Sequence, residues 1–129
     1  MLKVHALDSI FPHSNNFAHC VEVPAGTRLC FASGQIGIEK DGSIPASTRD
    51  QAELCFRRIE ALLAAADMTL RDVVRINAYI TDTREGDAYR TVRDSFMGDH
   101  KPANTVLFIT GLARPELKIE IEVVAAKAD

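Results

Sequence analysis

Histidine and cysteine are the side chains that most often ligate transition metals or act as nucleophiles, and the chain holds seven of them. Neither an HExxH motif nor another regular metal spacing connects the four histidines, which are His5, His13, His19 and His100. The cysteines are odd in number, lie far apart and form no CxxC pair: Cys20, Cys30 and Cys55. We therefore expect no metal centre and no disulfide framework, and we interpret the cysteines as buried thiols.

A Ser33-Gly34-Gln35 turn offers a hydroxyl beside a glycine. It lacks the GxSxG elbow of acyl-transfer enzymes, and no Ser/His/Asp set surrounds it. Gly34 is better explained as a position where backbone approaches a ligand closely, because glycine has no Cβ. The sequence contains no glycine-rich phosphate loop.

Carboxylates alternate with apolar residues near the C-terminal end. Between Leu117 and Ala126 the apolar positions 117, 119, 121 and 123 share one face of an expected strand, and Lys118, Glu120 and Glu122 share the other. One face of this strand is built to be buried and the other is charged.

The elements that must position these residues follow from the hydrophobic pattern. We expect a hairpin of two strands at 19–23 and 28–32, joined by a Pro-Ala-Gly-Thr turn. A helix should follow from about 48 to 66, with Ser47 or Thr48 as N-cap and Gln51 completing a capping box. Further on come a strand at 74–80, a helix at 87–97 and strands at 105–109 and 117–126, in the order β-β-α-β-α-β-β.

Two helices can cover only one side of such a sheet. The middle strand is also polar on one face, with Arg75, Asn77 and Tyr79. The uncovered face therefore meets either solvent or other subunits, and the pattern alone leaves both readings open.

Length and composition limit the function classes. With 129 residues, 47% hydrophobic and 26% charged, the chain fits one globular domain spanning 1–129. A net charge of -3 makes nucleic acid and membrane poor candidates as partners. The same charge leaves a small neutral or anionic metabolite possible as the ligand. The N-terminal stretch has no sustained apolar segment, so we expect a cytoplasmic protein.

Several short motifs in register resemble the Rid family, also called YjgF or RidA (reactive intermediate deaminase A), with the older label L-PSP endoribonuclease. They are Phe31-Ala32-Ser33-Gly34-Gln35-Ile36, Val73-Val74-Arg75, His100-Lys101-Pro102-Ala103 and Ile119-Glu120-Ile121-Glu122. The resemblance covers nearly the whole chain.

The resemblance implies an α+β fold of the chorismate-mutase-like (bacillus) type, with two helices on one face of the sheet. It also implies a homotrimer with ligand clefts between subunits, and hydrolysis of an enamine or imine to a carbonyl compound and ammonia, with no cofactor and no metal. By the same resemblance Glu120 handles the attacking water, while Phe17, Ser33, Gly34 and Asn104 line the cleft.

At Asn104 the chain departs from the family pattern, in which an arginine after Lys-Pro-Ala pairs with the substrate carboxylate. Val106 stands for the family's cysteine, Phe17 for a tyrosine, and Arg90 for an asparagine on the second helix. Asn104 can donate and accept hydrogen bonds, which suits an uncharged amide, carbonyl or imine. The substrate is therefore not expected to be a simple 2-imino acid, unless Arg90 or Arg114 replaces the lost charge.

Two other functions stay open at this point. The chain could be a non-catalytic trimer that binds a small metabolite as a sensor or regulator. Ribonuclease activity, which the older label suggests, is disfavoured by the negative net charge.

Overall fold

The computed structural model describes residues 2–12 and 16–129. In chain order its elements are β1 (Lys3–His5), β2 (Cys20–Glu22), β3 (Thr27–Ile36), α1 (Thr48–Ala65), β4 (Val73–Ile80), α2 (Gly86–Met97), β5 (Ala103–Phe108) and β6 (Ile119–Ala128). Short 3-10 turns at Leu70–Asp72 and Thr83–Glu85 precede β4 and α2.

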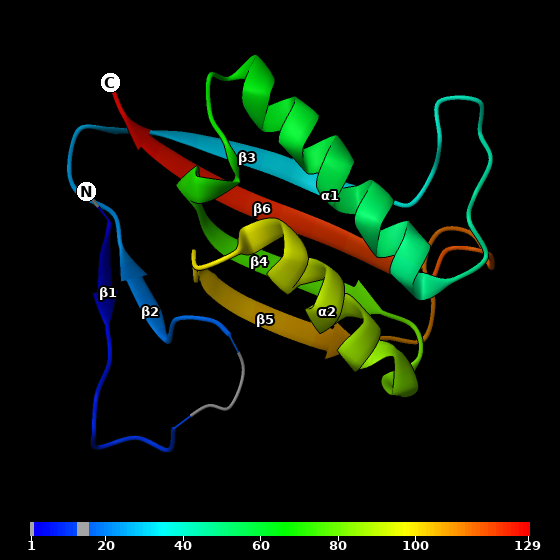
Figure 1. The fold of residues 1–129 in the computed structure, drawn as a ribbon, viewed down its shortest axis with the longest axis horizontal. Coiled ribbons are helices and arrows are strands. Elements are labelled where there is room, and N and C mark those ends of the chain that lie inside the picture. The colour runs from blue at the N-terminus through cyan, green and yellow to red at the C-terminus, as the bar shows by residue number, and fades with distance from the viewer. Residues whose placement is uncertain (1, 13–15) are drawn as a thin grey trace.

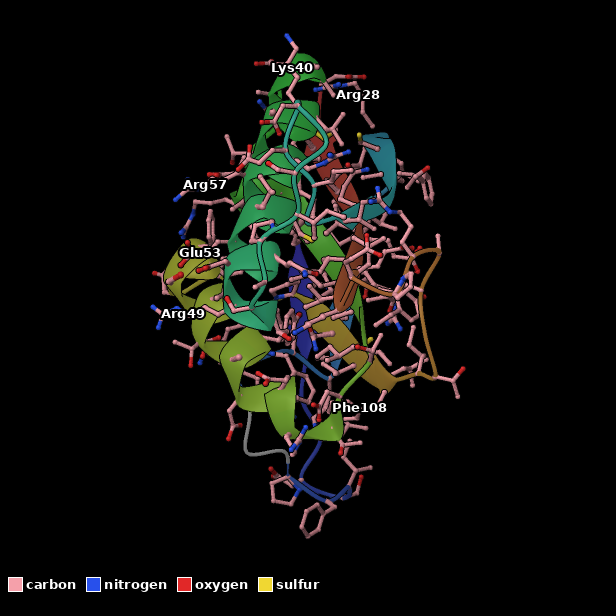
Figure 2. All side chains as sticks on the ribbon, turned by 90° about the vertical axis from the view of Figure 1, so that its right-hand side faces the viewer. Arg28, Lys40, Arg49, Glu53, Arg57 and Phe108 are labelled. Carbon is pink, nitrogen blue, oxygen red and sulfur yellow. The ribbon has the colours of Figure 1, made fainter. Side chains whose placement is uncertain are left out.

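The main sheet has the strand order β3-β6-β4-β5. Strand β6 runs antiparallel to both of its neighbours, and β5 runs parallel to β4. Both helices cross the same face of this sheet (Figure 1). Seen from the side, α1 and α2 lie together on one side of the strands, with Arg49, Glu53 and Arg57 on the outer surface of α1 (Figure 2). The expected α+β architecture with two helices on one face is confirmed.

The core lies between the helices and the sheet. Cys55, Phe56 and Ile59 of α1 are fully buried, as are Ile76 of β4 and Ile121 of β6. The alternation expected for the last strand holds, because Ile119, Ile121 and Val123 are buried while Glu120 and Glu122 are only partly covered. The apolar faces of the helices and of the strands thus pack against each other.

Helix α1 begins with a single N-cap hydrogen bond and no capping box. The Ser47 hydroxyl accepts a hydrogen bond from the Asp50 backbone N–H at 3.0 Å, so Ser47 is the N-cap. The expected capping box with Gln51 is wrong, because the Gln51 side chain is fully buried and bonds elsewhere.

The expected hairpin between β2 and β3 is also wrong. Strand β2 pairs antiparallel with β1, setting Lys3 opposite Glu22 and Val4 opposite Val21. This two-stranded sheet lies at the lower left in Figure 1, past the end of the main sheet where β5 begins and β6 ends. Opposite-charge and β-branched cross-strand pairs stabilise it, whereas the turn motif says nothing about which strand will pair.

The interpretation of all three cysteines as buried thiols holds only in part. Cys55 is buried, Cys30 is half-buried and Cys20 is exposed, and all three are free. Cys20 alternates outward in the short, largely exposed strand β2. Among the helices of the described residues, none is long and apolar enough to cross a bilayer.

Candidate functional site

The helix-free face of the main sheet carries a row of polar side chains. Glu122 of β6 accepts hydrogen bonds from the Tyr79 hydroxyl at 2.5 Å and from the Asn77 amide at 3.2 Å. At the edge of the same face, Arg75 donates to the Thr105 hydroxyl at 2.9 Å. The polar face expected from β4 is therefore an ordered hydrogen-bonded surface.

Tyr79 acts as a donor in this row. Its hydrogen bond to the Glu122 carboxylate is the main cause that raises the pKa of Tyr79 above the usual phenol range. The hydroxyl consequently keeps its proton at neutral pH and holds Glu122 in place.

Glu120 lies two residues before Glu122 on the same face, opposite Ile36 and Tyr79 of the neighbouring strands. Its side chain covers the backbone of Gly34, where the pairing of β3 with β6 is interrupted between Ala32 and Gln35. A Cβ at position 34 would lie 2.8 Å from Cγ of Glu120 and would overlap its carboxylate. Glycine is required here because the carboxylate occupies the space of a side chain.

Ser33 is exposed beside this contact. Together with Asn77 and Glu122 it lines a hollow of about 310 Å³, whose apolar lining includes Phe31. The structure thus places Ser33, Gly34 and Glu120 in one region of the helix-free face. Glu122, which accepts hydrogen bonds from Tyr79 and Asn77, lies in the same region. The expected turn at Ser33-Gly34-Gln35 is wrong, because these residues belong to strand β3.

A buried amide fixes the start of β6. Gln51 donates through Nε2 to the carbonyls of Pro45 and Glu116, at 2.8 and 2.9 Å, and accepts from the Lys118 N–H at 2.8 Å. Position 118 is two residues before Glu120, so Gln51 holds the strand end that carries the candidate catalytic carboxylate. This role of Gln51 was not predicted from the sequence.

Asn104 lies on the opposite face. It is the second residue of β5, pairs in register with the core residue Ile76 and faces α2. Its Oδ1 accepts a hydrogen bond at 2.7 Å from the hydroxyl of Tyr89, which is fully buried. Burial raises the pKa of Tyr89, so this phenol is also a donor.

Arg93 completes the cluster and was not predicted. It is only 2% exposed, its Nε donates to Asp94 at 2.9 Å, and its guanidinium carbon lies 5.7 Å from the Tyr89 ring centroid. A signal was present in the sequence: Arg93 stands four residues after Tyr89 and one after Val92, on the apolar stripe of α2, where an arginine must find partners.

The segment before β2 places Phe17 near this cluster. The Ala18 N–H donates to the Pro102 carbonyl at 3.0 Å, and Ala18 bridges Ala103, so this segment lies beside the start of β5. Asn16 contacts Asp94 at 3.5 Å. Phe17 is half-buried and lines a pocket of about 810 Å³ between the small sheet and the main sheet.

The two arginines proposed to replace the lost charge are both paired with acidic residues. Arg90 bonds Asp87 at 3.0 Å on α2, with its guanidinium near Gly86 and Phe108. Arg114 is exposed in the loop between β5 and β6 and bonds Glu116 at 2.9 Å.

The candidate residues therefore form two groups. Ser33, Gly34 and Glu120 lie on the helix-free face, whereas Asn104 lies on the helix-covered face with Phe17 near it. Because a strand sends alternate side chains to opposite faces, one chain cannot turn both groups toward the same ligand.

Histidines and acids do not gather into a metal site in the described parts of the chain, where no group of three or more potential ligands was found. His5 contacts Glu22 at 2.8 Å, and the His100 ring bonds the Val73 carbonyl at 2.7 Å. His13 lies outside the described residues. What the site offers chemically is a carboxylate beside exposed backbone on one face and an amide with a buried phenol on the other.

Known proteins resemble this chain over most of its length. A model of the family described as Endoribonuclease L-PSP matches residues 8–127. A protein of Escherichia coli (strain K12), named provisionally as the reactive intermediate deaminase TdcF, is 29% identical over 104 residues, which are 78% of this chain and 80% of that protein. The RutC family protein PH0854 of Pyrococcus horikoshii is 34% identical over 107 residues, covering 81% and 83%.

The fold is shared as well. The crystal structure of YyfB from Yersinia pestis, a protein of unknown function of the conserved Rid family, superposes with a TM-score of 0.84 at 25% identity, covering 96% of this chain and 97% of that one. With the family model spanning nearly all of the sequence and the same fold in a Rid protein, the chain belongs to the Endoribonuclease L-PSP family, that is, the Rid (YjgF) family.

Proposed function

We propose that the protein hydrolyses a reactive enamine or imine to a carbonyl compound and ammonia. The reaction takes place in clefts between the copies of a homotrimer whose sheets pack in the chorismate-mutase-like manner. Family membership and the deaminase name of the TdcF relative support the reaction class. The substrate is a small molecule and not a simple 2-imino acid, the single domain spans 1–129, and the reaction needs no cofactor and no metal in a cytoplasmic protein.

Glu120 serves as the base. Water attacks the carbon of the C=N bond while the carboxylate takes one of its protons, and the nitrogen receives a proton as the bond to carbon becomes single. Collapse of this carbinolamine forms the carbonyl group and releases ammonia, so that one water is consumed for each imine. The backbone at Ser33 and Gly34 lines the substrate's place beside the carboxylate.

The observation that carries the proposal is the placement of Glu120 and Asn104 on opposite faces of one sheet. A cleft that uses both residues requires two copies, with Glu120 from one and Asn104 from the other. The helix-free face also exposes large apolar side chains beside its polar row, namely Leu29, Phe31 and Leu107. A neighbouring subunit would cover them.

Turnover of imines tests the proposed function. An amino-acid oxidase generates 2-imino acids in situ from amino acids, an amine oxidase generates uncharged imines from amines, and semicarbazide traps the imines that survive. We expect the wild type to reduce the trapped pool of uncharged imines, and Glu120→Gln to lose at least about 100-fold in rate. Glu60→Gln, a matched change on the exposed side of α1, should keep the wild-type rate.

The alternative functions correspond to other outcomes. If wild type and Glu120→Gln are equally inactive on charged and neutral imines, the reading as a metabolite-binding trimer is favoured. RNA cleavage that survives repeated purification and is lost in Glu120→Gln would support the ribonuclease reading instead.

A further inference from the structure

The carboxamide of Asn104 is fixed by a hydrogen bond to its oxygen atom. Tyr89 donates to Oδ1 at 2.7 Å. Tyr89 is fully buried, and the guanidinium of Arg93, itself 2% exposed, packs beside it. These three side chains form a short row that runs from α2 to the second residue of β5.

The donors in this row fix which way the carboxamide faces. The guanidinium of Arg93, which can only donate, lies 5.7 Å from the Tyr89 ring centroid and offers the phenol no acceptor. The Tyr89 hydroxyl donates to Asn104, where only Oδ1 can accept a proton. The Nδ2 group is consequently turned away from Tyr89 with two N–H donors that Tyr89 does not use.

The positive charge in the row is already neutralised. Arg93 pairs with Asp94 at 2.9 Å and lies behind Tyr89, so its guanidinium is not presented as the family's arginine is expected to be. The row therefore offers a substrate two N–H donors but no unpaired positive charge for a carboxylate.

We propose, resting on the proposed function, that Asn104 is a specificity residue that donates its two N–H groups to an uncharged acceptor of the substrate. Such an acceptor is the carbonyl oxygen of an amide, ester or ketone next to the C=N bond. Tyr89 and Arg93 are positioning residues that set the direction of the Asn104 amide.

Two unreactive probes of nearly equal shape test this inference: methyl pyruvate, which is neutral and accepts hydrogen bonds, and pyruvate, which is charged. Both are titrated into ¹⁵N-labelled protein and followed by NMR. We expect methyl pyruvate to bind wild type at least about tenfold more tightly than pyruvate, and the Asn104 side-chain NH₂ signal to shift on binding. The NH₂ signal of Gln51, which is buried and bonded to two carbonyls, is the internal control and should stay in place.

Two variants should change the preference between the probes. Asn104→Arg should invert the preference in favour of pyruvate, because it restores a guanidinium for the carboxylate. Tyr89→Phe leaves the carboxamide free to rotate and should reduce the preference to less than about threefold. If Tyr89→Phe does not fold, the wild-type titration still decides.

A wild-type preference for pyruvate overturns the inference, as does methyl pyruvate binding that leaves the Asn104 signal unmoved. Failure of both probes to bind overturns it too. The two hypotheses can fail separately. If the protein hydrolyses imines but does not prefer methyl pyruvate, only the role of Asn104 is disproved. If it prefers methyl pyruvate but hydrolyses no imine, only the deaminase reaction is disproved.

Discussion

The side chain of Glu120 covers the backbone of Gly34 so closely that a Cβ at position 34 would lie 2.6 Å from the carboxylate carbon. Gly34 and Glu120 come from different strands, β3 and β6, at the point where the pairing between them is interrupted. The bare backbone at Gly34 is what allows the carboxylate to lie flat against the sheet.

Gly34→Ala therefore tests the position of the carboxylate. The added methyl group displaces Glu120 from its place, and we expect kcat/KM for imine hydrolysis to fall by about 100-fold, since a shift of about 1 Å can cost this much. Gly111→Ala is the matched control, because nothing lies within 4 Å of a Cβ there. Activity of Gly34→Ala equal to that of Gly111→Ala would contradict the assigned place of Glu120.

Gln51→Ala removes three hydrogen bonds at once and leaves the carbonyls of Pro45 and Glu116 and the Lys118 N–H without their partner. We expect the free energy of unfolding to fall by about 2–4 kcal/mol, measured by urea denaturation. Activity should fall as well, at temperatures where the variant is still folded, because the start of β6 loses its anchor. Glu60→Ala on the exposed side of the same helix should change neither quantity.

The buried thiol of Cys55 makes stability sensitive to alkaline pH. Burial, the largest cause, raises the pKa of Cys55 from 9.0 to about 12, with the Arg58 charge acting in the opposite direction. The unfolded chain loses this proton near pH 9 and the folded chain only near pH 12. The contribution of the protonated Cys55 thiol to the free energy of unfolding is therefore fully present below pH 9 and is lost as the pH rises toward 12.

We expect the free energy of unfolding to fall by about 2 kcal/mol between pH 8 and 10.5 through this thiol alone. Cys55→Ala should flatten that part of the profile, measured by denaturation at each pH. Cys20→Ala, at an exposed thiol, should leave the wild-type slope unchanged. An unaltered slope in Cys55→Ala would assign the loss to other groups.

Replacement of the lost charge by Arg90 or Arg114 can be tested with 2-oxobutanoate, a charged keto acid, by calorimetry. Both guanidinium groups are engaged with acidic neighbours, so we expect Arg90→Ala and Arg114→Ala each to change its affinity less than about twofold. A tenfold loss in either variant would show that this arginine reaches the ligand.

Sequence patterns predicted the fold well where a period extends over many residues. The alternation around Glu120 and Glu122 and the apolar stripe of α1 identify the sheet, the helices and the face that the helices leave open. The partner of β2 could not be predicted, because pairing depends on which strand meets it in space: β1 has only three residues, Lys3–His5.

The two groups of candidate site residues also differed in how far the sequence could predict them. The motifs pointed to Glu120 and to the Ser33-Gly34 stretch of β3, whose role in a site stays a prediction, but they did not show which face Asn104 occupies. The residues after 104 form a nearly continuous apolar run, Val106 to Ile109, in which no alternation marks the buried side. The link from Arg93 through Tyr89 to Asn104 joins a helix to a strand, and only the packing of α2 on the sheet creates it.

Complementation between two inactive variants tests most directly the claim that the site is shared between copies. Glu120→Gln and Asn104→Asp are each purified, then unfolded together in equal amounts and refolded, and imine hydrolysis is measured alongside the mass of the particle. We expect mixed trimers of about 43 kDa, three times the 14.2 kDa of one chain, with about a quarter of the wild-type activity, because one cleft in four then receives both native residues. Mixed particles that remain as inactive as either parent, or a monomeric protein that is active, would contradict the account.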